Sequence, residues 1–212
     1  MINLLKRSSA SRPYVLRIDS SARGEGSHSR ELADTVEAVL TARFAIKRRD
    51  LAKNPAEFIQ GETIEGFYTP SDAMTGRLKK ATSLSDTLID ELMGADVLLL
   101  SVPMYNFGIP ASLKAWVDQV VRINKTFSYD GGAFTGLVTG KRAVVTVSYG
   151  ASGYIDGEFA AANFVEPYLG FLLQFLGYTN VNFFRVESTT GEESQLKGAL
   201  ARAKRDIETA LG

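Results

Sequence analysis

One loop of the chain carries side chains that are suited to binding an anion. Residues 20–30, SSARGEGSHSR, contain four serines and two glycines and run directly into a segment with helical periodicity. Serine hydroxyls and free backbone N–H groups at a helix N-terminus face the positive end of the helix dipole, which favours a phosphate. The loop matches neither the G-x-G-x-x-G nor the G-K-[ST] pattern, so we expect a monophosphate. The alternative is an ordinary serine-capped helix that binds no ligand.

A second loop offers aromatic and amide groups. Residues 96–102 are a short apolar run typical of a strand that is buried on both faces, and a helix is expected to begin at Pro110. Between them, Asn106 can hydrogen-bond the polar edge of a flat ring, and Tyr105 and Phe107 can stack or pack against it. The alternative is an apolar loop that only plugs the end of the sheet. The residues of this loop are Met104, Tyr105, Asn106 and Phe107.

The composition excludes several classes of function. The chain has 212 residues, with 24 basic and 24 acidic side chains, so no basic field would attract nucleic acid or an anionic membrane. The absence of cysteine excludes a thiolate nucleophile and a cysteine-ligated metal, and it fits a reducing compartment such as the cytoplasm. With a single histidine, we expect no metal site. Residues 14–212 are expected to form one domain after a flexible extension at residues 1–13.

Strand and helix patterns alternate along the chain, which predicts the α/β class with helices on both faces of a parallel sheet. Right-handed crossovers favour the flavodoxin-like, doubly wound order 2-1-3-4-5 for five strands. A small hairpin is expected at residues 126–137, outside this sheet, and residues 54–69 are expected to be irregular. The expected strands are 14–19, 45–51, 96–102, 141–148 and 180–186, and helices are expected after residue 30, at 72–93, from Pro110, at 158–176 and at 192–211.

In this fold, the loops after the first, third and fourth strands meet at one edge of the sheet. These loops are residues 20–30, Met104–Phe107 and Ser148–Ala151. A phosphate-binding serine loop, an aromatic and amide loop and a glycine-containing turn together match flavin mononucleotide (FMN), which has a phosphate at one end and a ring system at the other. Because a flavin carries hydride and electron chemistry itself, no catalytic side chain would be needed.

Two other functions are open to this sequence. A flavodoxin-type electron carrier would use the same cofactor, but such carriers resemble strongly acidic monomers, and this chain has zero net charge and an added hairpin. A hydrolase would need a nucleophile with a base or a metal. His28 is the only histidine, and the sequence offers no convincing partners for it.

Several segments together resemble the bacterial FMN-dependent NADH azoreductases, a flavodoxin-like family that overlaps with quinone reductases. They are MYNFGIPASLKAWVD, FSYDGG, GLVTGKRAVV, DLAKNP and PYLGFLLQFLG. The resemblance implies a homodimer with one FMN per subunit at the dimer interface. It also implies ping-pong transfer of hydride from NADH to FMN and then to a quinone or an azo bond. Some relatives of this family have been labelled acyl carrier protein phosphodiesterases, which is the hydrolase alternative.

The resemblance also implies which residues bind FMN. The family's turn after the fourth strand usually reads S-R-G-G, whereas Tyr149 stands here in place of the arginine and Ala151 in place of the second glycine. Backbone contacts from this turn to the flavin are still expected. The implied phosphate-binding residues are Ser21, Ser27, His28 and Ser29, and the implied ring-binding residues are Met104, Tyr105, Asn106, Phe107, Ser148, Tyr149, Gly150 and Ala151.

Overall fold

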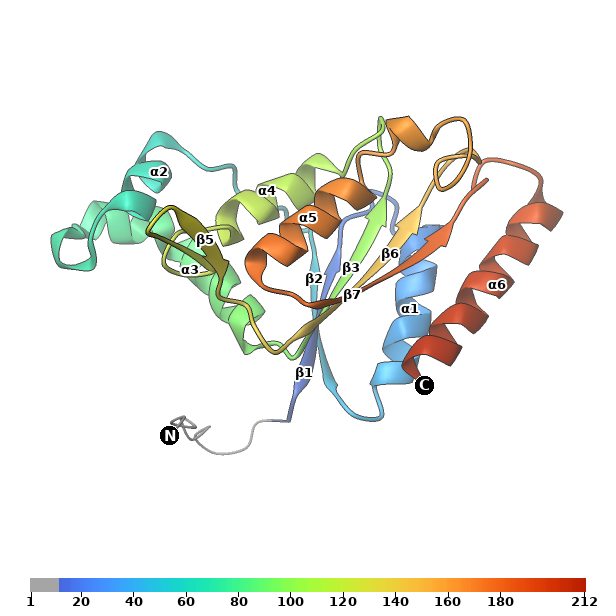
Figure 1. Ribbon diagram of the computed structural model, residues 1–212, viewed down its shortest axis with the longest axis horizontal. Helices are drawn as coiled ribbons and strands as arrows, with labels where there is room; N and C mark the ends of the chain where they lie inside the picture. Colours follow the sequence, from blue (N-terminus) through green and yellow to red (C-terminus); the bar gives the residue numbers. More distant parts are fainter. Residues whose placement is uncertain (1–11) are drawn as a thin grey trace.

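A five-stranded parallel sheet in the order β2-β1-β3-β6-β7 forms the centre of the protein, as seen in a computed structural model that describes residues 12–212 (Figure 1). The predicted order 2-1-3-4-5 is confirmed, since β6 and β7 are the fourth and fifth strands of this sheet. The strands are β1 (Tyr14–Asp19), β2 (Ala45–Asp50), β3 (Val97–Pro103), β6 (Arg142–Ser148) and β7 (Asn180–Val186).

Helices cover both faces of the sheet (Figure 1). On one face, α1 (His28–Leu40) and α6 (Glu193–Leu211) bury apolar residues such as Leu32 and Ile207. On the other face, α3 (Gly76–Gly94), α4 (Ala111–Val120) and α5 (Glu166–Leu176) bury residues that include Leu88 and Trp116. All seven residues of β3 are buried because helices pack on both sides of this central strand.

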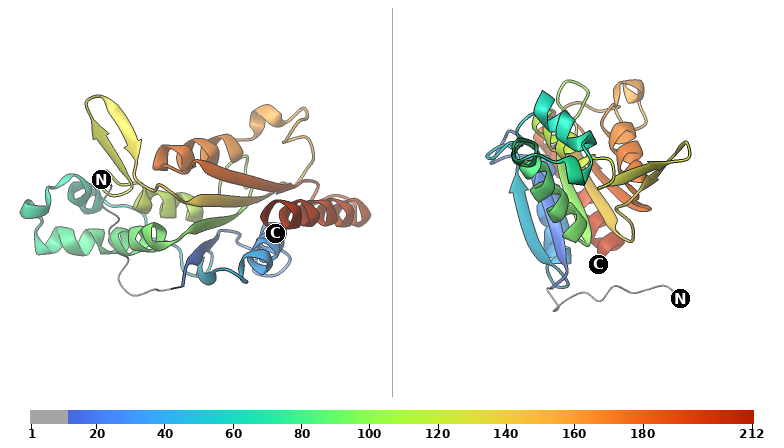
Figure 2. Two further views of the ribbon diagram at one scale, coloured as in Figure 1. Left: turned by 60° about the horizontal axis from the view of Figure 1, so that its bottom comes forward. Right: turned by 90° about the vertical axis from the view of Figure 1, so that its left-hand side faces the viewer.

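A two-stranded antiparallel hairpin stands apart from the sheet, as predicted (Figure 2). It consists of β4 (Phe127–Asp130) and β5 (Ala133–Gly136). Gly131 and Gly132 join the strands with positive φ angles of 58° and 90°, which glycine adopts without steric cost. Aromatic packing fixes the hairpin to α5, since the ring centroids of Phe127 and Phe175 are 4.9 Å apart.

Two expectations for the segment before β3 are wrong. Residues 61–68 form a helix, α2 (Gly61–Tyr68), where an irregular segment was expected. Its start is stabilised by the Thr63 hydroxyl, which accepts a hydrogen bond from the Gln60 backbone N–H at 3.2 Å. Helix α3 begins at Gly76 instead of residue 72, because Ser71–Ala73 forms a separate 3₁₀ turn and Thr75 caps α3.

The helix expected at residues 158–176 is also shorter than predicted, because α5 begins at Glu166. The Asn163 side-chain oxygen accepts hydrogen bonds from the N–H groups of Val165, at 3.2 Å, and Glu166, at 3.3 Å, which sets the start of the helix. Pro167 fits in the first turn because the N–H groups there have no partner within the helix, so its missing N–H costs no hydrogen bond. Within residues 158–165, only Ala160–Ala162 are helical, and they form a short 3₁₀ helix.

The flexible extension expected at residues 1–13 falls outside the described residues, apart from its last two. Across residues 12–212, no helix is long and apolar enough to cross a membrane. In the same part of the chain, no group of three or more histidine, cysteine or acidic residues is arranged to hold a metal ion.

The close contact between the hairpin and α5 can be tested with Gly136→Ala. An added Cβ would lie 2.3 Å from the backbone nitrogen of Gly177, so the backbone would have to move. We expect the free energy of unfolding to fall by about 1–3 kcal/mol in urea titrations followed by circular dichroism. Gly170→Ala, inside α5, is the control because its Cβ would meet no atom within 4 Å. Equal stability of both variants would show that the hairpin is not held there.

Candidate functional site

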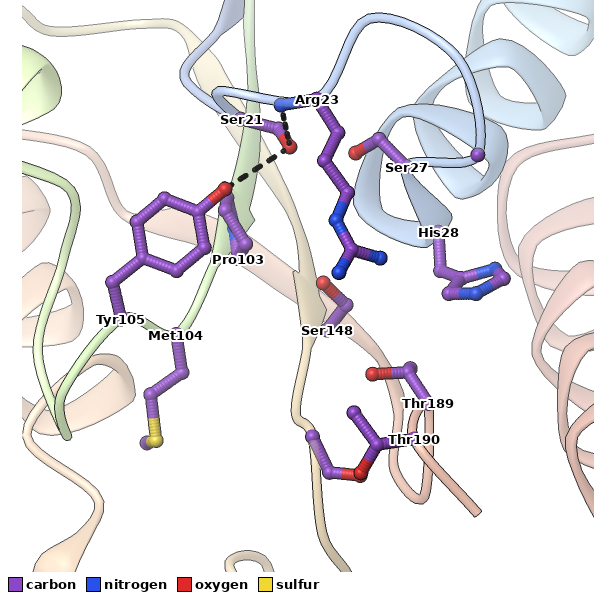
Figure 3. A pocket seen from close by; sticks show the side chains of 12 residues that line it. Ser21, Arg23, Ser27, His28, Pro103, Met104, Tyr105, Ser148, Thr189 and Thr190 are labelled. Atoms are coloured by element: carbon purple, nitrogen blue, oxygen red, sulfur yellow. Dashed lines mark hydrogen bonds between the residues drawn. The ribbon is translucent and has the colours of Figure 1, made fainter. Parts of the chain in front are cut away.

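Four loops at the carboxyl ends of β1, β3, β6 and β7 surround a cavity of about 150 Å³ (Figure 3). Three of these loops are the ones expected to converge, and their meeting at one edge of the sheet is confirmed. The pairing of Pro103 with Ser148, and of Asp19 with Ser101, brings the ends of these parallel strands together. The cavity is lined by Ser21, Arg23, Gly26, Ser27, His28, Pro103, Met104, Tyr105, Ser148, Gly150, Thr189 and Thr190.

The N-terminus of α1 supplies hydroxyl and N–H groups to the cavity. Ser27 precedes the helix in an extended conformation, but its side chain makes no capping hydrogen bond, so the hydroxyl is available to a ligand. Ser29 is fully buried, and its hydroxyl lies 3.2 Å from that of Ser101 and 3.3 Å from that of Ser27. The side chain of Ser29 therefore supports Ser27 from within the protein, and only its backbone N–H is placed to meet an anion.

The peptide that joins Ser21 to Ala22 connects the first loop with two other parts of the site. Its N–H donates a hydrogen bond to the Tyr105 hydroxyl at 3.1 Å, and its carbonyl accepts one from Arg30 Nη2 at 2.9 Å. Tyr105 follows β3 and Arg30 lies in α1, so both ends of one peptide are held by different elements. The Ser21 hydroxyl, 3.5 Å from that of Tyr105, is thereby fixed at the cavity wall.

Arg30 is itself held by an ion pair with the end of β2. Its two terminal nitrogens each lie 2.9 Å from an oxygen of Asp50, and the side chain is 12% exposed. The hydrogen bond from Arg30 is the main cause of a lowered pKa for Asp50, and the backbone N–H groups of Ala52 and Lys53 lower it further. The same contact raises the pKa of Arg30. The first loop is therefore tied to the edge strand through charge-assisted hydrogen bonds.

Asp50→Asn tests this ion pair through the acid dependence of stability. Because the pKa of Asp50 is lowered by folding, its carboxylate stabilises the protein above its unfolded-state pKa of about 3.9, and this stability is lost as the pH falls through the folded-state value. We expect the variant to be less stable near neutral pH and to lose less stability in acid, as measured by urea unfolding across pH. The exposed Asp72→Asn is the control. Parallel profiles for Asp50→Asn and the wild type would contradict the assignment.

The second loop contains a tight turn with an unusual backbone. Tyr105 and Gly108 exchange two backbone hydrogen bonds, at 3.0 and 3.1 Å, and the two residues between them have positive φ angles. Asn106 (φ 48°) tolerates this conformation, but Phe107 (φ 72°) pays a steric cost of about 1–2 kcal/mol. The Phe107 carbonyl is held by the N–H of Phe164 at 3.1 Å. The Phe107 ring is half-exposed and does not line the cavity.

Tyr149, at the position where the resemblance implies an arginine, points into the protein core. Its side chain is fully buried, its hydroxyl donates to the carboxylate of Glu166, and Asn163 Nδ2 donates to the same hydroxyl at 3.1 Å. Burial, followed by the nearby Glu166 carboxylate, raises the pKa of Tyr149. The ring is stacked on Tyr154 with centroids 5.5 Å apart. Only the backbone of Tyr149 is therefore placed to contact a ligand.

A fourth loop, which the sequence analysis did not include, binds the third one. The hydroxyls of Thr189 and Thr190 donate to the carbonyls of Tyr149 and Gly150, each at 2.9 Å, and both threonines line the cavity. Since β7 is the neighbour of β6, its loop reaches the same edge of the sheet, and applying the strand-end rule to the fifth strand would have found it. Arg23, Gly26 and Pro103 are further lining residues that the sequence analysis did not single out.

The expected site residues fall into two groups by position. Those that line the cavity are Ser21, Ser27, His28, Met104, Tyr105, Ser148 and Gly150. Those outside its lining are Ser29, Asn106, Phe107, Tyr149 and Ala151, each of which lies within two residues of a lining residue in sequence. Roles for both groups in binding a cofactor are still predictions.

Comparison with known proteins places the chain in a family. The sequence model described as "Flavodoxin-like fold" matches residues 14–211. An FMN-dependent NADH:quinone oxidoreductase of Xanthobacter autotrophicus is 51% identical over 171 residues, which are 79% of this chain and 82% of that protein. The chain therefore belongs to the family of FMN-dependent NADH:quinone oxidoreductases, which has the flavodoxin-like fold. A protein of the same name from Nostoc punctiforme is 38% identical over 200 residues, covering 93% of this chain and 97% of its own length.

Solved structures share the fold of this family member. An azoreductase of Bacillus anthracis superposes with a TM-score of 0.86 at 21% identity, covering 94% of this chain and 98% of its own. An FMN-dependent NADH-azoreductase of the same species, determined in complex with FMN, superposes with a TM-score of 0.82 at 18% identity and covers 94% of this chain and all of its own. At these identities the likeness concerns the fold alone.

Proposed function

We propose that this protein is an FMN-dependent NADH:quinone oxidoreductase that also reduces azo bonds. When bound, FMN would supply the hydride chemistry that links NADH to a quinone or an azo compound in a ping-pong sequence. The observation that carries the proposal is the convergence of a hydroxyl-lined cavity at the α1 N-terminus with the Met104–Phe107 loop, in a chain 51% identical to an enzyme of this name.

The residues around the cavity fit an FMN phosphate. The Ser27 hydroxyl has no capping partner, and the first N–H groups of α1 lie beside it, as a phosphate at a helix N-terminus requires. Ser21 and His28 complete this end, together with the backbone of Ser29. We infer that the phosphate is bound here.

The ring system is proposed to lie towards the second and third loops. The cavity of about 150 Å³ is smaller than the roughly 300 Å³ at the lower end of ligand pockets, so by itself it would hold only part of an FMN molecule. Met104 and Tyr105 lie on that side, followed by Asn106 and Phe107. Backbone groups of the Ser148–Ala151 turn would face the opposite edge of the ring.

The chain's own contribution to the reaction is proposed to be binding and positioning. Tyr105 orients the first loop through its hydroxyl, which accepts the Ala22 N–H, while its ring lines the cavity. No side chain is assigned as a general acid or base. We also considered Tyr129 and Tyr105 as side chains that could contact the electron acceptor, but Tyr129 lies on the hairpin and does not line this cavity.

The two alternatives have less support. An electron carrier would not be expected to share 51% identity with an NADH-oxidising enzyme. A hydrolase needs a base next to a nucleophile, but the hydrogen bond of the His28 ring is to Glu31, at 3.3 Å, and not to a serine. We further propose a cytoplasmic location, supported by the lack of cysteine, and no nucleic-acid or membrane partner, supported by the zero net charge.

The proposal is tested by the absorbance of the purified protein. We expect it to be yellow with bound FMN, to lose its visible absorbance when NADH is added under nitrogen, and to regain it when a quinone is added. The rates of the two half-reactions should each be independent of the other substrate, as ping-pong exchange requires. Retention of FMN without bleaching by NADH would favour the electron carrier, and failure to take up any FMN would refute both flavin functions.

The proposed partner is a second copy of the chain. Tyr129 and Phe134 of the hairpin and Phe171 of α5 are 52%, 61% and 71% exposed. The rings of Tyr129 and Phe134 lie 4.7 Å apart, and Phe175 joins Phe134 to Phe171, with centroid distances of 5.6 and 6.2 Å. A continuous exposed aromatic surface is typical of a protein interface.

Phe171→Arg tests the homodimer. We expect the wild type to sediment as a dimer in analytical ultracentrifugation and the variant to shift towards monomer, because a charge would replace a buried ring at the interface. Tyr68→Arg is the control, since Tyr68 is 73% exposed and belongs to α2, not to the hairpin or to α5. A monomeric wild type, or equal dissociation constants for both variants, would contradict this interface.

A further inference from the structure

Arg23 is the only permanently charged side chain among the residues that line the cavity at the α1 N-terminus. The other lining groups are serine and threonine hydroxyls, glycine and proline backbone, the Tyr105 hydroxyl, the Met104 thioether and the His28 ring. None of the lining residues is acidic. A cavity with one cation and no carboxylate attracts an anion by its charge as well as by its hydroxyls.

The charge of Arg23 is not neutralised by the protein, in contrast to the arginines near it. Arg17 lies 3.1 Å from Asp19, and Arg30 lies 2.9 Å from Asp50. Within residues 12–212, Arg23 makes no ion pair. Its guanidinium is therefore free to pair with a ligand without breaking an existing contact.

The backbone of Arg23 holds its side chain towards the cavity. The Arg23 N–H donates to the Ser21 hydroxyl at 3.2 Å, and Figure 3 shows the side chain extending between Ser27 and Ser148. A phosphate at the start of α1 would thus have helix N–H groups on one side and a guanidinium within the same cavity. The planar guanidinium matches two phosphate oxygens at once.

We propose that Arg23 determines the specificity of this site for the phosphorylated flavin, FMN, over riboflavin, which has the same ring and tail without the phosphate. This inference rests on the proposed function and adds to it a residue outside the expected phosphate-binding set. A phosphate monoester carries roughly two negative charges at neutral pH, and the hydroxyls and the helix N-terminus alone supply no full positive charge. Arg23 supplies it.

The test is the dissociation constant of the flavin-free protein for FMN and for riboflavin, measured by flavin fluorescence at low and high ionic strength. Arg23→Gln should weaken FMN binding about ten- to a hundredfold, the range expected for a lost hydrogen bond to a charged group. Riboflavin binding should change less than about twofold, because riboflavin lacks the group that Arg23 binds. The salt dependence of FMN binding should also decrease.

Two further variants separate a specific role from a general one. Arg23→Lys keeps the charge and should lose less FMN affinity than Arg23→Gln, although it cannot bind two oxygens in one plane. Lys79→Gln removes an exposed cation from α3, outside this cavity, and should leave the FMN to riboflavin ratio unchanged. Equal weakening of both flavins by Arg23→Gln, or no weakening of either, would overturn the proposal.

Failure of the proposed function would be recognised separately. If the wild type binds no FMN, the proposed flavin function is refuted. Binding of inorganic phosphate to the cavity is then measured by ³¹P NMR line broadening. Phosphate binding that is lost in Arg23→Gln would support Arg23 as the anion-binding residue. Phosphate binding that is absent in the wild type or unchanged in the variant would overturn it.

Discussion

The geometry of the cavity depends on the peptide between Ser21 and Ala22, which is hydrogen-bonded at both ends. Arg30 holds its carbonyl and Tyr105 accepts its N–H, so this single peptide joins α1, the β1 loop and the β3 loop. Arg30 in turn is held by Asp50 at the end of β2. Three neighbouring strands, β2, β1 and β3, thereby fix one wall of the cavity through hydrogen bonds, of which those of Arg30 are charge-assisted and therefore the stronger ones.

The opposite wall is fixed in a different way. There the backbone carbonyls of Tyr149 and Gly150 are held by the hydroxyls of Thr189 and Thr190, and the Tyr149 side chain anchors the turn from inside the core. The turn of residues 148–151 itself contains no charged side chain. Together with Arg23 on the first loop, this places the positive charge of the cavity at the α1 end.

Much of the fold is predicted by local patterns. The strands at residues 14–19 and 180–186 were predicted with the bounds that the structure has, because short apolar, β-branched runs between turn residues are a local signal. The helices were less well predicted. Their ends depend on capping hydrogen bonds such as those of the Asn163 side chain. These bonds start α5 at Glu166, although the apolar residues between 158 and 165 suggested an earlier start. Helix α2 was missed because it has only eight residues, so its apolar periodicity extends over too few turns to distinguish it from an irregular segment.

The sequence by itself determined that the loops after the strands meet at one edge, since alternating strands and helices with right-handed crossovers leave few other arrangements. It also indicated which loops contain hydroxyl, aromatic and amide groups. Only the tertiary structure decided which side chains face the cavity: Ser27 and Arg23 do, whereas Ser29 and Tyr149 turn inward. The physical reason is that side-chain direction depends on partners far along the chain, such as Ser101 for Ser29 and Glu166 for Tyr149, which no local pattern reveals.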